Sequence, residues 1–275
     1  MGGKMAKSIT PGRSCAYLAL VILVLIAVFP VFWTILNSLK GLIDIVTPVP
    51  KFFFTPTLDN YLYVFERPKV QSGLINSGII VGSALLIGSV LGIPAAYALA
   101  KYKLKLGDDL KFFVLSMRFL PPVAVAIPLM AIYLELGLYD TVISMIMTYS
   151  LLTLSTIIWL SIPAFDNVPN NIEEAAKLDG YNAYEIFFKV ALPVAAPALF
   201  GAIVFSFVLV WNEFLIALML TTSEAKTLPI VASEFTLLGR NVPWGILNAS
   251  VIVLSLPPLI FLGVISGFLN RIFKK

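Results

Sequence analysis

Residues 74–100 read LINSGIIVGSALLIGSVLGIPAAYALA, an apolar run that contains no charged side chain. An α-helix of about 20 residues crosses the roughly 30 Å hydrocarbon core of a bilayer, so this run is long enough to span a membrane. Strands of a membrane barrel would instead show shorter segments of alternating polarity. The stretch therefore predicts a transmembrane helix.

Five further apolar runs of comparable length lie at residues 16–36, 112–134, 141–162, 194–220 and 246–269. Arg118 and Glu213 are the only formally charged residues within the six runs. Of all 275 residues, 59% are hydrophobic and only 12% are charged, which is too apolar for a soluble protein. We predict an all-α, polytopic membrane bundle of six transmembrane helices.

The residue types that the chain lacks exclude several classes of catalytic and metal site. There is no histidine, and Cys15 is the single cysteine. Histidine-based catalysis, histidine-ligated metal sites, disulfides and cysteine-ligated clusters are therefore excluded. We expect no catalytic residue, no metal site and no enzyme activity. The net charge of +4 is modest, and its distribution gives no reason to expect nucleic acid as a partner.

The distribution of Lys and Arg predicts the orientation in the membrane. Twice as many of them lie in the segments 1–15, 101–111, 163–193 and 270–275 as in the alternating segments between the other span ends. Positive residues are enriched in cytoplasmic loops, so we expect both termini to be cytoplasmic. The first span is interpreted as an uncleaved anchor in the cell membrane.

The segment 163–193 is too long for a plain connector, and its residues predict two short helices. Asn170 with Glu173 has the spacing of a capping box for the first helix, and Asn182 with Glu185 repeats it for the second. Gly180 is expected to end the first helix, because glycine accepts the left-handed conformation. We expect the small side chains of Ala175 and Ala176 to allow another surface to approach.

Within this segment, residues 174–180 read EAAKLDG, followed by Val190, Leu192 and Pro193. The spacing resembles the cytoplasmic EAA motif of ABC importer permeases, with Val190 where isoleucine is usual. Softer similarities are INSGIIVGS from Ile75, RFLPPVAVAIPL from Arg118, GLYDT from Gly137, WNEFLIAL from Trp211 and TLPI from Thr227. Together they resemble the carbohydrate-uptake branch, in particular the six-span permease of maltose-type and glycerol-3-phosphate-type systems.

The resemblance implies a type I importer fold and a set of partners. The segment 1–72 would hold the first anchor helix and an outer loop, 73–269 the permease core with the coupling loop 163–193, and 270–275 a cytoplasmic tail. Partners would be a homologous permease, two ATP-binding subunits and an extracytoplasmic sugar-binding protein. The chain has no phosphate-binding loop, so ATP and Mg would be used by the partner subunits and no cofactor is expected here. The ATPase would dock on the coupling helix, at Glu173, Glu174, Ala175, Ala176, Asp179 and Gly180.

A second group of residues is a candidate for the substrate pathway: Asn76, Trp211, Asn212 and Glu213. An aromatic ring beside hydrogen-bonding groups suits a polyhydroxylated ligand, although an interface tryptophan with two helix-bonding polar residues would show the same pattern. Counting along straight helices places Arg118 about 9 Å and Glu213 about 28 Å from the cytoplasmic edge. That separation rules out an ion pair, and Arg118 is interpreted as snorkelling to lipid headgroups or lining the path.

The alternative function is a stand-alone secondary carrier or channel for a small polar solute. It would require no ATPase, and solute flux in vesicles that contain this chain alone would distinguish it. The sequence does not name the sugar.

Overall fold

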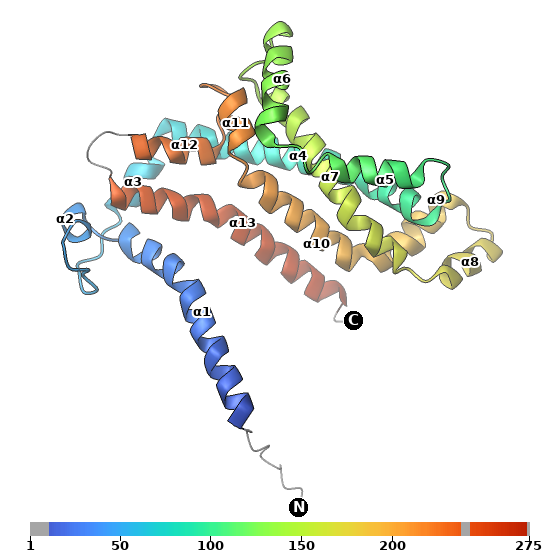
Figure 1. Cartoon of the computed structure of the whole chain (residues 1–275), viewed down its shortest axis with the longest axis horizontal. Coiled ribbons are helices and arrows are strands. Elements are labelled where there is room, and N and C mark those ends of the chain that lie inside the picture. Colours follow the sequence, from blue (N-terminus) through green and yellow to red (C-terminus); the bar gives the residue numbers. More distant parts are fainter. Residues whose placement is uncertain (1–10, 238–242, 274–275) are drawn as a thin grey trace, which may run out of the picture. The chain divides into compact units, whose positions relative to one another are not determined.

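The computed structural model describes residues 11–237 and 243–273, and these residues form helices and no strand (Figure 1). The helices are α1 (Pro11–Ser38), α2 (Leu42–Ile45), α3 (Asp59–Phe65), α4 (Pro68–Lys101), α5 (Gly107–Ser116), α6 (Pro122–Glu135), α7 (Val142–Asp166), α8 (Asn170–Leu178), α9 (Ala183–Ile186), α10 (Leu192–Trp211), α11 (Leu215–Leu220), α12 (Leu228–Glu234) and α13 (Trp244–Phe273). A π-helical turn, Phe187–Ala191, joins α9 to α10, and a 3₁₀ turn, Phe235–Leu237, follows α12. The all-α prediction is confirmed.

Five helices are long and apolar enough to cross a membrane. They are Ala16–Ser38, Pro68–Lys101, Val142–Asp166, the continuous helix Ala183–Trp211, and Trp244–Gly267. Each overlaps a predicted span. The predicted count of six does not hold as continuous spans, because the remaining predicted span, 112–134, is broken in the structure.

That span is divided between α5 and α6, with Met117–Pro121 between them. Two consecutive prolines cause the break. Pro121 lacks an amide hydrogen and drives Leu120 out of the helical region, whereas Pro122 suits the first position of a new helix. The shorter apolar helix Pro122–Glu135 follows. The predicted span 194–220 is also broken: α10 ends at Trp211, and α11 begins at Leu215.

The chain forms two compact units. Among the described residues, the smaller comprises 11–64, 235–237 and 243–253, and the larger comprises 65–234 and 254–273, so that α13 begins in one and ends in the other. The predicted division at residue 72 stays a prediction. In the smaller unit, the amide of Asn60 donates to the carbonyls of Ser38 and Lys40, both at 2.9 Å, and so ties α3 to the end of α1.

A buried lysine stabilises this junction in the smaller unit. Lys40 is 1% exposed, and its ammonium lies 4.8 Å from the ring centre of Trp33 and 5.3 Å from that of Phe54. It also donates to Asn37 Oδ1 at 3.1 Å. Burial lowers the pKa of Lys40, and the nearby Asp44 carboxylate partly opposes this. Aromatic faces therefore help to compensate the desolvated charge.

In the larger unit, α4 and α7 pack closely along their length. Small residues of α4 make this possible, since Gly88 and Gly92 face Thr153 and Ile157 of α7. Thr153 Oγ1 also donates across the contact to the carbonyl of Ala84 at 2.8 Å. Such small-residue contacts with an interhelical hydrogen bond are typical of helix pairs in membranes.

The close approach at Gly88 gives a prediction. A Cβ at this position would lie 2.5 Å from Thr153 Oγ1 and 3.1 Å from the amide nitrogen of Leu154. We expect Gly88→Ala to lower the free energy of unfolding by about 1–3 kcal/mol, because α4 and α7 must separate. Thermal unfolding of the purified protein in detergent measures this. Gly82→Ala is the control on the same helix, where a Cβ meets nothing within 4 Å; equal melting temperatures of the two variants would contradict the prediction.

Candidate functional site

The predicted coupling helix exists as α8, and it lies with α9 at one end of the larger unit, away from α11 and α12 (Figure 1). Gly180 follows it with a φ of +86°, in the left-handed region. The amides of Gly180 and Tyr181 donate back to the carbonyls of Lys177 and Ala176, at 3.1 and 3.0 Å. The prediction that Gly180 ends the helix is confirmed, and the chain turns sharply there.

One of the two predicted capping boxes is wrong. Pro169 occupies the cap position of α8, so Asn170 is the first helical residue and makes no cap. Its Oδ1 instead accepts from Lys101 Nζ at 2.9 Å. The helix starts one residue earlier than predicted because proline supplies the extended backbone that a cap requires. The second box is confirmed: Glu185 N donates to Asn182 Oδ1 at 3.0 Å, and Asn182 N donates to Glu185 Oε2 at 3.1 Å.

The docking residues divide between the two faces of α8. Glu173 and Ala176 are buried, at 7% and 6% exposure, and so do not belong to the exposed face of α8. Glu173 turns inward because Lys101 lies there, with its Nζ 3.7 Å from Glu173 Oε2. Glu174, Ala175, Asp179 and Gly180 are exposed, as the docking prediction requires.

Sequence reasoning missed the apolar part of this exposed surface. Leu178 is 90% exposed and Tyr184 is 80% exposed, and Tyr181 lies between them in the chain with 41% exposure. These three residues with Glu174, Ala175 and Asp179 are called the docking surface below. The available signal was Leu178 itself, a large apolar residue three positions beyond Ala175 and four beyond Glu174 on one helical face.

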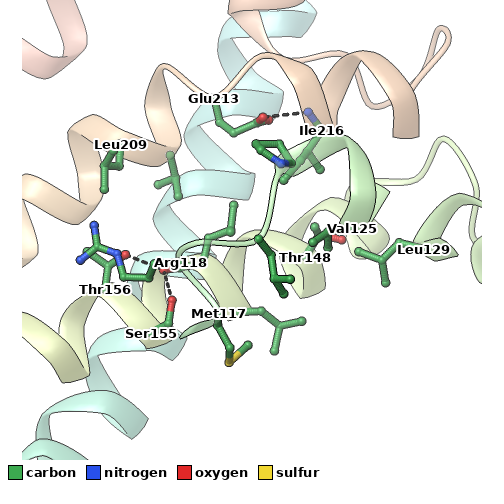
Figure 2. A pocket seen from close by; sticks show the side chains of 15 residues that line it. Met117, Arg118, Val125, Leu129, Thr148, Ser155, Thr156, Leu209, Glu213 and Ile216 are labelled. Atoms are coloured by element: carbon green, nitrogen blue, oxygen red, sulfur yellow. Dashed lines mark hydrogen bonds between the residues drawn. The ribbon is translucent and has the colours of Figure 1, made fainter. Parts of the chain in front are cut away.

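A pocket of about 300 Å³ lies within the larger unit, between α7, α10, α11 and the break before α6 (Figure 2). Most of its lining is aliphatic, and its polar groups come from Arg118, Thr148, Ser155, Thr156 and Glu213. The Thr148, Ser155 and Thr156 hydroxyls donate within α7, to Ser144 O, Leu152 O and Leu152 O. The oxygens of Ser155 and Thr156 can still accept hydrogen bonds, whereas Thr148 Oγ1 is also hydrogen-bonded to Tyr133 OH at 2.9 Å.

Glu213 stabilises the break after α10. Its Oε1 accepts from the amide of Ile216 at 2.7 Å, and its Oε2 accepts from the amide of Ala217 at 3.1 Å and from Tyr149 OH at 2.8 Å. Figure 2 shows the carboxylate turned toward Ile216. The side chain therefore satisfies the free amides at the start of α11 and complements the positive end of that helix.

Arg118 lines the same pocket as Glu213, which counting along straight helices does not anticipate. Both predicted spans are interrupted at these residues, so the calculated separation of depths does not apply. No hydrogen bond or ion pair of the Arg118 guanidinium is found among the residues that the structure describes. It thus supplies the unused donors of the pocket.

The other candidates for the substrate pathway lie elsewhere. Trp211 is 4% exposed, donates to the carbonyl of Leu254 at 3.0 Å and stacks on Phe207, so it packs α10 against α13. Asn212 is exposed and donates to Val208 O of its own helix at 2.8 Å. Asn76 lines a different pocket and donates to the carbonyls of Glu224 and Lys226, at 2.8 and 3.1 Å. Of Trp211, Asn212 and Glu213, Glu213 alone lines the pocket between α7, α10 and α11.

Within residues 11–237 and 243–273, no three His, Cys, Asp or Glu side chains come together as metal ligands would.

Known proteins share the sequence pattern and the architecture of this chain. Residues 88–275 match the family model described as binding-protein-dependent transport system inner membrane component. The chain belongs to this family. The trehalose transport system permease protein SugB of Mycobacterium tuberculosis is 34% identical, over 86% of this chain and 86% of that protein. The sulfoquinovosyl glycerol transport system permease protein SmoH of Agrobacterium fabrum is 30% identical, over 91% and 88%.

Solved structures show the same fold for this family member. A bacterial ABC transporter involved in the import of the acidic polysaccharide alginate aligns with a TM-score of 0.76 and 20% identity, over 97% of this chain and 99% of that chain. The bacterial alginate ABC transporter in complex with an alginate pentasaccharide-bound periplasmic protein aligns with a TM-score of 0.74 and 15% identity, over 99% of both chains. The chain is thus a membrane protein with the importer permease fold.

A carboxylate clamp outside the spans completes the site description, and sequence reasoning missed it. Asp140, at a φ of 58°, accepts hydrogen bonds from the amides of Thr222, Ser223, Glu224 and Ala225 and from the hydroxyls of Thr222 and Ser223, at 2.8–3.1 Å. Burial raises the pKa of Asp140, but these hydrogen bonds outweigh it and hold the pKa well below its usual range. The clamp fixes the loop that also accepts hydrogen bonds from Asn76.

This clamp predicts a specific loss of stability. Asn tolerates the positive φ of residue 140, so Asp140→Asn keeps the backbone and removes one accepting oxygen and the charge. We expect the free energy of unfolding to fall by about 1–3 kcal/mol, measured by thermal unfolding in detergent. Asp108→Asn serves as the control, since the Asp108 side chain is fully exposed and 3.8 Å from Lys111. If the hydrogen bonds of Asp140 did not contribute to stability, Asp140→Asn and Asp108→Asn would have the same melting temperature.

Proposed function

We propose that this chain is the permease subunit of an ATP-driven, binding-protein-dependent importer of a carbohydrate, and that it docks an ATPase through α8. Family membership and the relatives named for trehalose and sulfoquinovosyl glycerol support the importer over a stand-alone carrier or channel. The observation that carries the docking role is the EAAKLDG helix itself, which ends in a left-handed glycine and exposes Leu178.

The proposed transporter contains further subunits. A homologous permease completes the translocation pathway, two ATP-binding subunits hold ATP and Mg, and an extracytoplasmic sugar-binding protein delivers the solute. The periplasmic protein in the alginate transporter structure supports the last partner. Both termini and α8 face the cytoplasm, in agreement with the excess of Lys and Arg in those segments. The chain itself carries out no catalysis and binds no cofactor.

The mechanism depends on a rigid contact. The docking surface combines exposed apolar residues with the carboxylates of Glu174 and Asp179, which suits a cleft lined by apolar groups and Arg or Lys. When the ATPase subunits close, they move α8 as one rigid element, called the arm, and not as a flexible loop. That movement alternates the access of the pathway between the two sides of the membrane.

The pocket between α7, α10 and α11 forms part of the solute path in this chain. Its acceptor oxygens and the guanidinium of Arg118 complement the hydroxyl groups of a saccharide. Glu213 contributes an oxygen at the pocket wall while it holds the start of α11. Trp211 supports this wall from behind through α13.

Removal of the apolar part of the docking surface tests the docking role. The paired change Leu178→Ser and Tyr184→Ser should reduce the ATPase that copurifies with the complex by about tenfold or more, since exposed apolar anchors dominate interface energy. The amount of ATPase per permease, measured after mild detergent extraction, reports this. The control is Leu104→Ser with Leu106→Ser, two exposed leucines of the loop between α4 and α5. Equal retention of the ATPase in both pairs would reject α8 as the docking helix.

Kinetics of uptake test the solute path. Arg118→Gln should raise the KM for sugar uptake about tenfold or more without reducing ATPase copurification, because the bonds of a charged donor are lost. Glu213→Gln should raise it less, since its oxygens are already occupied by the amides of α11. Lys103→Gln, outside the pocket, is the control. An unchanged KM in Arg118→Gln for every sugar transported would exclude this pocket from the path.

A further inference from the structure

Lys101, the last residue of α4, connects the membrane-spanning helix directly to the segment that carries α8. Its Nζ donates to the carbonyl of Val168 at 2.7 Å and to Asn170 Oδ1 at 2.9 Å. The same nitrogen lies 3.7 Å from Glu173 Oε2. The side chains of Lys101 and Glu173 are 8% and 9% exposed, so this is a buried ion pair rather than a surface contact.

An aromatic cluster lies beside this pair and joins the same elements. Tyr97 of α4 lies with its ring centre 5.2 Å from that of Phe165 of α7 and 5.0 Å from that of Phe187 in the π-helical turn. Ile172 of α8 packs against the core cluster that contains all three rings. The base of α8 is therefore held by an apolar contact and by Lys101 at once.

The charges at this junction depend on each other. Glu173 Oε1 is buried and has no hydrogen-bond partner among the described residues, and Lys101 supplies the counter-charge of the Glu173 carboxylate. A buried ion that loses its partner is strongly destabilised in place. Lys101 also provides the sole side-chain hydrogen bonds between α4 and the residues Val168–Asn170 that the structure describes.

The helices behind Lys101 lead to the pocket. α4 packs on α7 through Gly88 and Thr153, and Ser155 and Thr156 of the same α7 segment line the pocket. A displacement of α8 that is passed to Lys101 therefore reaches the pocket through two helices in direct contact. Tyr184 of the docking surface lies at the start of the continuous helix Ala183–Trp211, whose Leu209 and Val210 also line the pocket, so a second connection runs through α10.

We propose that Lys101 is a positioning residue that transmits the movement of α8 to α4, with Glu173 as its buried counter-charge. This inference rests on the proposed function, because it assumes that an ATPase moves α8. It assigns Glu173 to transmission and leaves contact with the ATPase to the docking surface. Loss of Lys101 should weaken the link between ATP hydrolysis and transport more than it weakens docking.

The experiment uses the complete transporter in proteoliposomes, with solute uptake and ATP hydrolysis measured in the same vesicles. Lys101→Met and Glu173→Gln should each lower the ratio of solute transported to ATP hydrolysed by about tenfold, within the range known for coupling mutations. Copurifying ATPase should stay near the wild-type value, whereas the melting temperature should fall, because each variant leaves a buried charge without its partner. Lys101→Arg should restore the ratio, because it keeps the charge and the donors. Lys103→Met is the control, an exposed lysine two residues away.

The outcomes separate the two proposals. A wild-type ratio in Lys101→Met would overturn the inference and leave the docking role intact. Loss of copurifying ATPase in both Lys101→Met and Lys101→Arg would assign Lys101 to the folding of the segment that carries α8 and would also overturn transmission. A wild-type complex that retains no ATPase would instead reject the proposed function.

Discussion

The contact between α4 and α7 is the constraint on which the larger unit depends. The two helices approach closely because Gly88 and Gly92 of α4 have no side chains. Gly92 faces the branched side chain of Ile157 on α7. The Thr153 hydroxyl uses this proximity to bond a carbonyl of the opposite helix. Because α7 also contributes to the pocket and α4 ends at the base of α8, this one packing arrangement relates the pathway to the arm.

The breaks in the helices show how a membrane protein keeps its backbone satisfied. Each interruption frees amides and carbonyls that lipid cannot hydrogen-bond, so another group must replace the lost partner. After α10 this group is the carboxylate of Glu213, which bonds two amides of α11 and a tyrosine. Before α6, fewer replacement hydrogen-bond partners are needed, because Pro121 and Pro122 have no amide hydrogen. The pocket lies where these two interruptions meet.

Sequence reasoning worked where a signal is local. Apolar length predicted the helices, Gly180 predicted the end of α8, and Asn182 with Glu185 predicted a capping box that the structure contains. It was wrong where the outcome depends on a partner far along the chain. Glu173 turns inward because of Lys101, about seventy residues away.

The prediction of the substrate-pathway residues rests on a local pattern that does not fix where the side chains point. Motif similarity drew attention to Trp211, Asn212 and Glu213 as neighbours in sequence, yet α10 ends at Trp211, and Asn212 and Glu213 lie in the break before α11, where the side chains point in different directions. Trp211 therefore meets α13, Asn212 faces away, and Glu213 caps the next helix. Asp140 was missed because a carboxylate that gathers six donors from another loop has no signature within its own segment.

The π-helical turn at Phe187–Ala191 has a consequence for how the arm is aimed. A wider turn holds an extra residue compared with an α-helix, so it resets the rotational phase of everything that follows by about 100°. One additional residue in this turn therefore sets the rotational orientation of α8 relative to α10. Gain or loss of one residue in this turn would rotate α8 relative to α10 without changing the residues of either helix.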